Sequence, residues 1–428
     1  MARRLPSAIP IVPVAVNLVR AATRDRLAPE KMEQLQARLL RKLVTHAHAT
    51  VPYYRETLDP DVVATFTGPA DLHRLPILPR SEISLQGARL LADGFSPANT
   101  REARSSGTTG KPATSYFSEG DLGYLRATYL WDLLATGMRP TDRIAYFRVG
   151  GFRRHRLEKL GLARNVHVNT SLGLDEQVEA FLAGRPNFLC GFPNAIVAVV
   201  GELKRRGIRP DDVRGVVFAG EKVTQAARTE VTEYFGARAN EVYASVETYS
   251  IARSCPRGAL HLRSGDVAVE VEHDDGSVSR ATAGGLLEGN ILVTRLHAEA
   301  MPLLRYRLGD RVLIGPDDCA CTTFSTPIVR QVIGRTVDQL QTADGRLRHG
   351  DWVGSMIIPL PGIRQFQLVQ AEPGKVEVLI VPATTPTDLA ERAAAAMAST
   401  PDFDITVRLV DTIPPGPNGK IRMVHSLL

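Results

Sequence analysis

The stretch Ser105-Ser106-Gly107-Thr108-Thr109-Gly110-Lys111-Pro112 carries more information about the fold than any other part of this chain. Its two glycines permit backbone conformations that are closed to other residues. Backbone amides and four hydroxyl groups can then surround an anion, and the lysine adds a point charge suited to phosphate. The segment predicts a loop that holds phosphate groups.

Two other interpretations of this loop were weighed. A Walker P-loop requires Gly-x-x-x-x-Gly-Lys-Ser/Thr. Ser105 stands at the first glycine position and Pro112 follows the lysine, so the Walker pattern is excluded. Composition alone leaves open a flexible surface loop rich in Ser, Gly and Thr.

The chain has 428 residues, of which 44% are hydrophobic and 23% charged, as in an ordinary globular protein. Its net charge of +6 comes from scattered arginines. The basic clusters at 152–156 and 204–206 are short and lack interleaved stacking aromatics, which argues against nucleic-acid binding. The charge fits an anionic substrate or cofactor equally well. Four cysteines do not make a disulfide framework, so we expect a cytoplasmic protein.

Residues 9–19 form an apolar run after two arginines and superficially resemble a secretory signal. Pro10 and Pro13 interrupt the run, and no small-x-small cleavage site follows. The run is also shorter than the roughly 20 residues that a membrane-spanning helix needs. We therefore expect no membrane span and a peripheral or partner-facing N-terminal segment.

The middle of the chain alternates between helical and strand patterns, which predicts an α/β fold with parallel strands. Helices are expected at 29–49, 119–135, 175–183 and 224–235, and strands at 143–147, 187–190, 213–218 and 240–243. From about residue 268, strands at 267–272 and 290–294 surround turn-forming glycines, which predicts an antiparallel, barrel-like section.

The last part of the chain predicts a small α+β domain of its own. Strands are expected at 364–370, 375–381 and 405–410, with an alanine-rich helix at 388–398. The expected division is a large α/β domain at 1–333 and a small mobile C-terminal domain at 334–428.

An ordered set of motifs resembles the adenylate-forming ligases, in particular the branch of phenylacetate–CoA ligase with its coenzyme-F synthetase and capsule-biosynthesis relatives. After the upstream segments 46–55 and 75–78 come the loop at 105–112, Ala219-Gly220-Glu221, Tyr243-Ala244-Ser245-Val246-Glu247, Arg305-Tyr306-Arg307-Leu308-Gly309-Asp310, Gly334-Arg335 and Gly419-Lys420-Ile421-Arg422. Each motif alone is weak, but their order is specific.

The resemblance implies an enzyme that joins a carboxylate to the α-phosphate of ATP and releases pyrophosphate. It implies three catalytic residues: Lys111 on the phosphates, Glu247 on Mg²⁺, and Lys420, which bridges the carboxylate and the α-phosphate. Asp310 and Arg335 would orient the ribose. The further implied ATP-binding residues are Ser105, Ser106, Gly107, Thr108, Thr109, Gly110, Ala219, Gly220, Glu221, Tyr243, Ala244 and Ser245.

The sequence departs from the family pattern at several positions. Ala244 and Val246 stand where the family usually has glycine and a hydroxyl residue, although Ser245 lies between them. Val337 replaces the first aspartate after the Gly-Arg pair, and Leu308 replaces a usual threonine. The stretch 345–350 lacks the glycine-rich pattern of CoA ligases.

Three of the four cysteines and one histidine predict a metal site. Cys255 and His261 follow the Glu247 motif, and Cys319 and Cys321 follow the Asp310 motif. Three thiolates and an imidazole make a closed tetrahedral zinc site. The alternative is a set of small buried thiols with an unrelated histidine. The resembled branch often carries cysteines at these places, which favours a structural zinc ion.

We expect a small, planar, preferably aromatic carboxylic acid as the substrate. The side chains expected to line its pocket are Tyr124, Trp131, Phe147, Phe192 and Tyr249. CoA is the acceptor that the family implies, while an amine or a carrier-protein thiol remains open. A non-catalytic protein that binds nucleotide or zinc is an alternative of another class. The sequence also leaves open whether the chain forms a homodimer.

Overall fold

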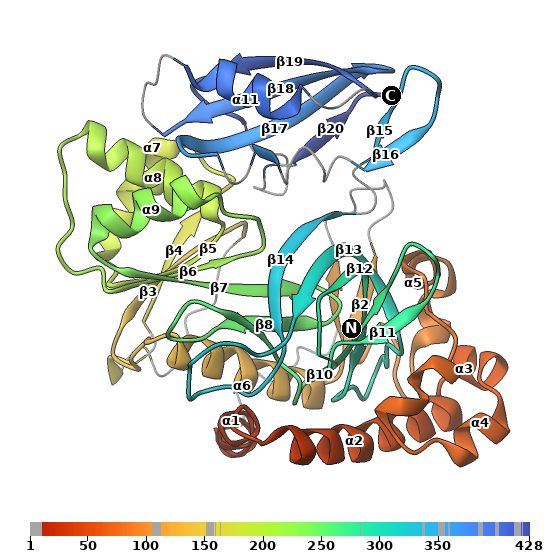
Figure 1. The fold of residues 1–428 in the computed structure, drawn as a ribbon. Helices are drawn as coiled ribbons and strands as arrows, with labels where there is room; N and C mark the ends of the chain where they lie inside the picture. Colours follow the sequence, from red (N-terminus) through yellow and green to blue (C-terminus); the bar gives the residue numbers. More distant parts are fainter. Residues whose placement is uncertain are drawn as a thin grey trace. The chain divides into compact units, whose positions relative to one another are not determined.

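The computed structural model describes residues 11–104, 113–150, 158, 160–162, 164–282, 284–335, 339–349, 356–357, 360–383, 388–398, 402–414, 421 and 423–428. Contacts divide the chain into two units (Figure 1). Unit 1 comprises Met1–Ala135 and Val242–Val332, and unit 2 comprises Thr136–Glu241 and Ile333–Leu428. The functional division at 333/334 stays a prediction.

Unit 1 begins with helices that pack on its antiparallel strands. They are α1 (Ile11–Arg24), α2 (Pro29–Thr50), α3 (Pro52–Thr57), α4 (Pro60–Thr65), η1 (Pro69–Arg74), α5 (Arg80–Gln86), η2 (Gly87–Leu90) and α6 (Glu119–Ala135). α2 starts with a proline, which is favoured there because an N–H group at this position would have no intrahelical acceptor. Its buried Leu40, Leu43, Val44 and Ala47 share one face, as helical periodicity requires.

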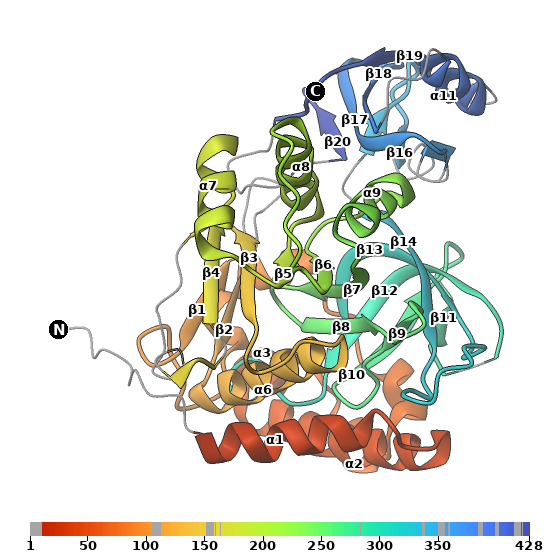
Figure 2. The same ribbon diagram turned by 90° about the vertical axis from the view of Figure 1, so that its left-hand side faces the viewer.

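The N-terminal apolar run belongs to a helix, which the sequence reasoning did not foresee. α1 includes Pro13 in its first turn, where a proline removes an amide that lacks an intrahelical partner. α1 lies beside α6 in Figures 1 and 2. Among the described residues, we find no helix with the length and apolarity needed to cross a membrane.

The strands of unit 1 form the expected antiparallel section. They are β8 (Tyr249–Ser254), β9 (Leu260–Leu262), β10 (Val267–Glu272), β11 (Val278–Arg280), β12 (Leu287–Arg295) and β13 (Tyr306–Gly315). β10 pairs antiparallel with β11 and β12, and β12 pairs with β13. The separate hairpin of β1 (Arg101–Arg104) and β2 (Thr114–Phe117) flanks the loop at 105–112, which lies outside the described residues.

Unit 2 contains a parallel sheet, as the alternating pattern predicts. Its strands are β3 (Arg143–Arg148), β4 (Arg164–Asn169), β5 (Phe188–Gly191) and β6 (Gly215–Ala219), in the order β4-β3-β5-β6. β4 was not among the predicted strands. All three pairings are parallel. The helices α7 (Leu174–Gly184), α8 (Pro193–Arg205) and α9 (Gln225–Phe235) lie next to this sheet in Figure 2. The sequence analysis did not predict α8.

The C-terminal part of unit 2 is the expected α+β arrangement. β17 (Ile363–Glu372), β18 (Lys375–Pro382), β19 (Asp404–Leu409) and β20 (Val424–Ser426) form a sheet in the order β19-β18-β17-β20, with α11 (Leu389–Met397). β15 (Gln339–Gln341) and β16 (Leu347–His349) form a hairpin. The chain passes between the units within β7 (Arg238–Ser245) and β14 (Ile328–Arg335).

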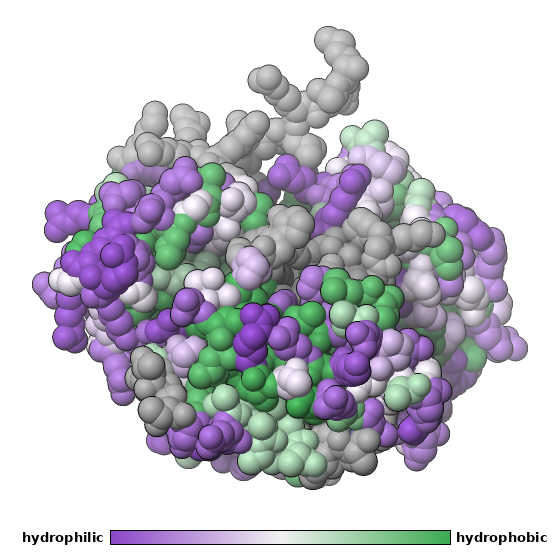
Figure 3. Space-filling view, turned by 90° about the horizontal axis from the view of Figure 1, so that it is seen from above, coloured by the Kyte–Doolittle hydropathy of each residue, from purple (hydrophilic) through white to green (hydrophobic). Residues whose placement is uncertain are grey.

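Each unit has its own apolar cores. Leu78, Ile251, Val293 and Tyr306 belong to the largest core of unit 1, while α7–α9 and the parallel strands enclose a core of unit 2. On the face drawn in Figure 3, patches of hydrophobic residues lie among hydrophilic ones.

Candidate functional site

The turn between β7 and β8 positions Glu247, the residue expected to hold Mg²⁺. Ser245 pairs with Tyr249 across this turn, and the Glu247 side chain is only 2% exposed. Tyr249 has φ 61°, a left-handed conformation that is strained for a bulky side chain. Such strain is typical of functional sites, where the surrounding structure maintains it.

Arg80, at the start of α5, compensates the buried charge of Glu247. Its Nη1 donates to Glu247 Oε1 at 2.8 Å and to the Tyr306 hydroxyl at 3.0 Å. Burial and the nearby Glu247 carboxylate raise the pKa of Tyr306 well above its usual value, so the phenol keeps its proton. The sequence analysis missed Arg80. Its position directly after the 75–78 motif was the available signal.

Tyr243 and Asp310, both expected at the nucleotide, are brought together by the fold of unit 1. The Tyr243 hydroxyl donates to Asp310 Oδ2 at 2.7 Å. Gly309 just before this aspartate has φ 88°, which favours glycine. Ser245 accepts the Thr248 amide at 3.0 Å, while Ala244 is exposed.

The arginines of the Arg305–Asp310 motif have structural partners. Arg305 is buried and makes two hydrogen bonds to Glu270, at 2.8 and 3.1 Å. Arg307 pairs in the same way with Glu272. These ion pairs join β13 to β10 across β12, so the two arginines hold Asp310 in place indirectly.

In unit 2, Ala219 ends β6, and Gly220 and Glu221 follow at the carboxyl end of this strand. Ligands of parallel sheets commonly bind at this edge. Glu221 Oε2 accepts hydrogen bonds from the amide of Asn194 at 3.4 Å and from its side chain at 3.1 Å, at the start of α8. Glu221 Oε1 accepts the amide of Ile421 at 2.9 Å. This carboxylate therefore contacts the segment that directly follows Lys420.

Several expected site residues cannot be placed. Ser105, Ser106, Gly107, Thr108, Thr109, Gly110, Lys111 and Lys420 lie outside the described residues, and nothing is described of the Arg335 side chain at the end of β14. Their roles stay predictions.

The aromatic residues expected around the acid occupy varied positions. Tyr249 meets Phe117 edge-on, with ring centroids 5.2 Å apart. Phe147 is buried in the core of unit 2, and Phe192 precedes the first turn of α8. Tyr124 and Trp131 both belong to the polar network described next. Their contact with the substrate stays a prediction.

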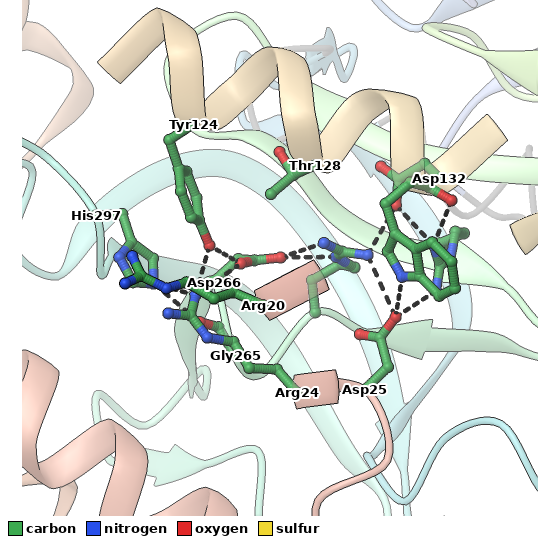
Figure 4. Close-up of polar contacts among 12 residues, drawn as sticks. Arg20, Arg24, Asp25, Tyr124, Thr128, Asp132, Gly265, Asp266 and His297 are labelled. Carbon is green, nitrogen blue, oxygen red and sulfur yellow. Dashed lines mark hydrogen bonds and ion pairs between the residues drawn. The ribbon is translucent and has the colours of Figure 1, made fainter. Parts of the chain in front are cut away.

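A buried network of ion pairs and hydrogen bonds surrounds Tyr124 and Trp131 (Figure 4). The Tyr124 hydroxyl donates to Asp266, and Trp131 Nε1 donates to Asp25 at 2.5 Å. Two buried arginines complete the network. Arg253 pairs with Asp25 and Asp132, while Arg263 pairs with Asp132 and Asp266. The network fastens the end of α1 to α6 and to the strands.

The predicted cysteine–histidine cluster is assembled in unit 1. The ligand atoms of Cys255, His261, Cys319 and Cys321 all lie within 4.8 Å of one another. The sulfurs of Cys255 and Cys319 are 3.7 Å apart, and Cys321 Sγ lies 3.5 Å from His261 Nε2. In a tetrahedral zinc site with bonds of about 2.3 Å, neighbouring sulfurs are about 3.8 Å apart. The spacing fits zinc and is far too long for a disulfide.

A backbone carbonyl fixes the tautomer of His261 in the cluster. Its Nδ1 lies 3.0 Å from the Thr326 carbonyl oxygen. A carbonyl can only accept, so Nδ1 carries the proton and Nε2 is left to face the cysteines. Burial raises the pKa of the Cys319 thiol to about 11, so a cation is needed to keep it as a thiolate.

Comparisons with known proteins agree with the sequence motifs. No protein-family model matches the chain. It is 30% identical to a phenylacetate–coenzyme A ligase of Thermus thermophilus over 334 residues, which cover 74% of this chain and 73% of the relative. It is 28% identical to the Aromatoleum evansii enzyme of the same name over 338 residues, with the same coverage.

Solved structures share the fold at low sequence identity. A 2-hydroxyisobutyryl-CoA ligase in complex with an acyl-AMP has a TM-score of 0.75 at 14% identity, covering 100% of this chain and 94% of that one. An anthranilate CoA ligase in complex with anthranoyl-AMP has a TM-score of 0.53 at 16% identity, covering 75% and 65%. The solved structures show the fold alone, whereas the 30% identity to the Thermus thermophilus enzyme also shows the family. The chain belongs to the phenylacetate–CoA ligase family.

Proposed function

We propose that this protein is an AMP-forming ligase that activates a small carboxylic acid with ATP and transfers the acyl group to the thiol of CoA. The observation that carries the proposal is the ordered set of motifs in a chain that is 30% identical to a phenylacetate–CoA ligase. The hydrogen bond between Tyr243 and Asp310 and the buried Glu247 support it, because both lie in motifs of that set.

The first half-reaction requires electrostatic stabilisation rather than covalent chemistry by the protein. A carboxylate oxygen of the acid attacks the α-phosphorus of ATP, and pyrophosphate leaves. Lys111 and the loop hydroxyls would bind the pyrophosphate side, and Lys420 would bind the carboxylate and the α-phosphate. Asp310 would accept hydrogen bonds from the ribose, with Tyr243 fixing its carboxylate.

Glu247 has the chemistry to hold Mg²⁺, a hard cation that prefers carboxylate and phosphate oxygens. The ion would neutralise charge on the triphosphate. Arg80 already contacts Glu247 Oε1 at 2.8 Å, so it would orient the carboxylate in the buried turn.

Cys255, His261, Cys319 and Cys321 would hold a structural zinc ion. Four protein ligands leave no open coordination position for substrate. The ion would tie the loop that carries Cys319 and Cys321 to strands β8 and β9, and so support the antiparallel section that carries Asp310.

We propose an aromatic acid as the substrate, as the named relatives act on phenylacetate. Tyr124, Trp131, Phe147, Phe192 and Tyr249 remain the candidates to line its pocket. The deciding experiment is ATP–pyrophosphate exchange over a panel of aryl and alkyl carboxylic acids, followed by product analysis with CoA.

The outcomes of that experiment separate the alternatives. Acid-dependent exchange with thioester formation supports the proposal. Exchange without consumption of CoA favours an amine or carrier-protein acceptor. The absence of exchange with every acid favours a non-catalytic nucleotide- or zinc-binding protein. A Lys420→Ala variant should fold and lose exchange by two orders of magnitude or more.

A further inference from the structure

Glu221 connects the body of unit 2 to the C-terminal segment through one carboxylate. Asn194 holds Oε2 with its amide and its side chain, at the N-terminus of the 13-residue helix α8. A negative charge is favoured at this end of a helix. The other oxygen, Oε1, accepts the amide of Ile421 at 2.9 Å. The contacts with Asn194 therefore orient the carboxylate independently of its contact with the C-terminal segment.

The position of Ile421 makes this contact informative. The nitrogen of Ile421 is bonded to the carbonyl carbon of Lys420, and a peptide unit is planar. An acceptor that holds this amide therefore restrains the peptide that the lysine shares.

A second, independent attachment keeps the C-terminal sheet on the same body. Thr224 Oγ1 donates to the carbonyl oxygen of Ile363 at 2.8 Å, and Arg364 makes two bonds of 2.8 Å to Glu230. Both contacts hold the start of β17. Because β20 pairs with β17, this attachment also restricts the strand that follows Ile421. The contact of Glu221 with the Ile421 amide is a further attachment, at the residue that follows Lys420.

We infer that Glu221 is a positioning residue for adenylate formation, which acts by docking the Lys420–Ile421 peptide rather than by binding the nucleotide. The inference rests on the proposed function, since that function assigns Lys420 its role. It also changes the expectation for Glu221, which the family resemblance counted among the ATP-binding residues.

The test separates docking from nucleotide binding. Glu221→Ala should lower kcat of ATP–pyrophosphate exchange about ten- to a hundredfold, as expected for loss of a hydrogen bond to a charged group, and leave KM for ATP within threefold. Conversion of the synthetic acyl-adenylate and CoA to thioester should stay within threefold. Glu221→Gln, which keeps an acceptor oxygen, should retain part of the exchange activity.

Hydrogen exchange provides a readout that does not depend on catalysis. In Glu221→Ala, the peptide that contains Ile421 should exchange faster, while peptides from β17 should keep their protection. Arg364→Gln is the matched control, because it weakens the other attachment of the same sheet. It should leave kcat of pyrophosphate exchange within threefold.

Three results would overturn the inference. A raised KM for ATP with an unchanged kcat would assign Glu221 to the nucleotide. Equal losses in both half-reactions with a lowered unfolding midpoint would make the residue merely structural. Unchanged protection of Ile421 would show that the contact does not hold the segment. If the unmodified enzyme shows no ATP–pyrophosphate exchange with any acid of the panel, the proposed function fails. Hydrogen exchange then still reports whether Glu221 docks Ile421.

Discussion

The hydroxyl of Tyr243 donates a 2.7 Å hydrogen bond to the carboxylate of Asp310, 67 residues further along the chain. The bond joins the β7 motif to the β13 motif within unit 1. It restricts the rotation of the Asp310 carboxylate, which favours a fixed direction for the second oxygen.

Replacing Tyr243 by Phe tests this orientation. Tyr243→Phe removes one hydrogen bond to a charged acceptor, worth about 1.5 to 3 kcal/mol. We expect KM for ATP to rise about ten- to a hundredfold and the unfolding midpoint to change little, because the aromatic ring stays. Steady-state kinetics at saturating acid measures this. A loss confined to KM for the acid would contradict the assignment.

Arg80 and Glu247 provide a prediction about stability. Arg80→Met leaves the Glu247 carboxylate buried beside Tyr306 without its cation, and we expect a loss of about 2 to 3 kcal/mol in the free energy of unfolding, since Arg80 is partly exposed. Urea denaturation at pH 7 measures this. The control Arg89→Met breaks an exposed pair with Glu56 and should cost less than about 1 kcal/mol. Equal losses in the two variants would refute the prediction.

Periodicity and turn residues predicted most of the fold. The structure confirms the parallel strands β3, β5 and β6 and the antiparallel pair β10–β12. Short apolar runs between helices are typical of buried parallel strands, and alternating runs around turn-forming glycines are typical of antiparallel strands. α1 was missed because Pro13 was taken to interrupt the run. In the first turn of a helix, a proline costs no hydrogen bond.

The site was predictable where motifs carry the chemistry. The cysteine–histidine cluster was predicted from its residue types and from the family resemblance. Tyr243 and Asp310 were both expected at the nucleotide, but the hydrogen bond between them was not predicted. Arg80 and the network around Asp132 were not foreseen, because their partners lie more than 100 residues away in sequence. Burial of a charge by tertiary packing cannot be seen in its sequence neighbours, so for Arg80 only its place after the 75–78 motif offered a signal.

The cluster of Cys255, His261, Cys319 and Cys321 predicts one bound zinc ion per chain. Cys319→Ser should lose the stoichiometric metal and lower the unfolding midpoint by several degrees, because metal binding is coupled to folding. Metal analysis of purified protein and thermal denaturation measure the two effects. Cys190→Ser, which changes a buried cysteine of unit 2, should keep the metal. Metal-free unmodified protein with an unchanged midpoint would contradict the site.

His297 predicts how the stability of unit 1 depends on pH. The ring lies against Tyr124, with centroids 4.2 Å apart, and its Nε2 is 2.8 Å from Arg24 Nη1 (Figure 4). Burial lowers the pKa of His297 to about 4 from an ordinary value near 6.5. The folded state therefore binds fewer protons than the unfolded state between these values. The stabilising contribution is complete above pH 6.5 and is lost as the pH falls toward 4.

The lowered pKa of His297 sets the size of this contribution. It is at most about 3 kcal/mol, because a change of one in pKa corresponds to 1.36 kcal/mol. His297→Gln keeps an acceptor for Arg24 but does not titrate, so the variant should lose less stability than the unmodified protein between pH 6.5 and 4. Urea denaturation at half-unit pH steps measures the difference. His425→Gln, an exposed position on β20, should follow the unmodified protein. Parallel curves for all three proteins would show that His297 is not held neutral by its surroundings.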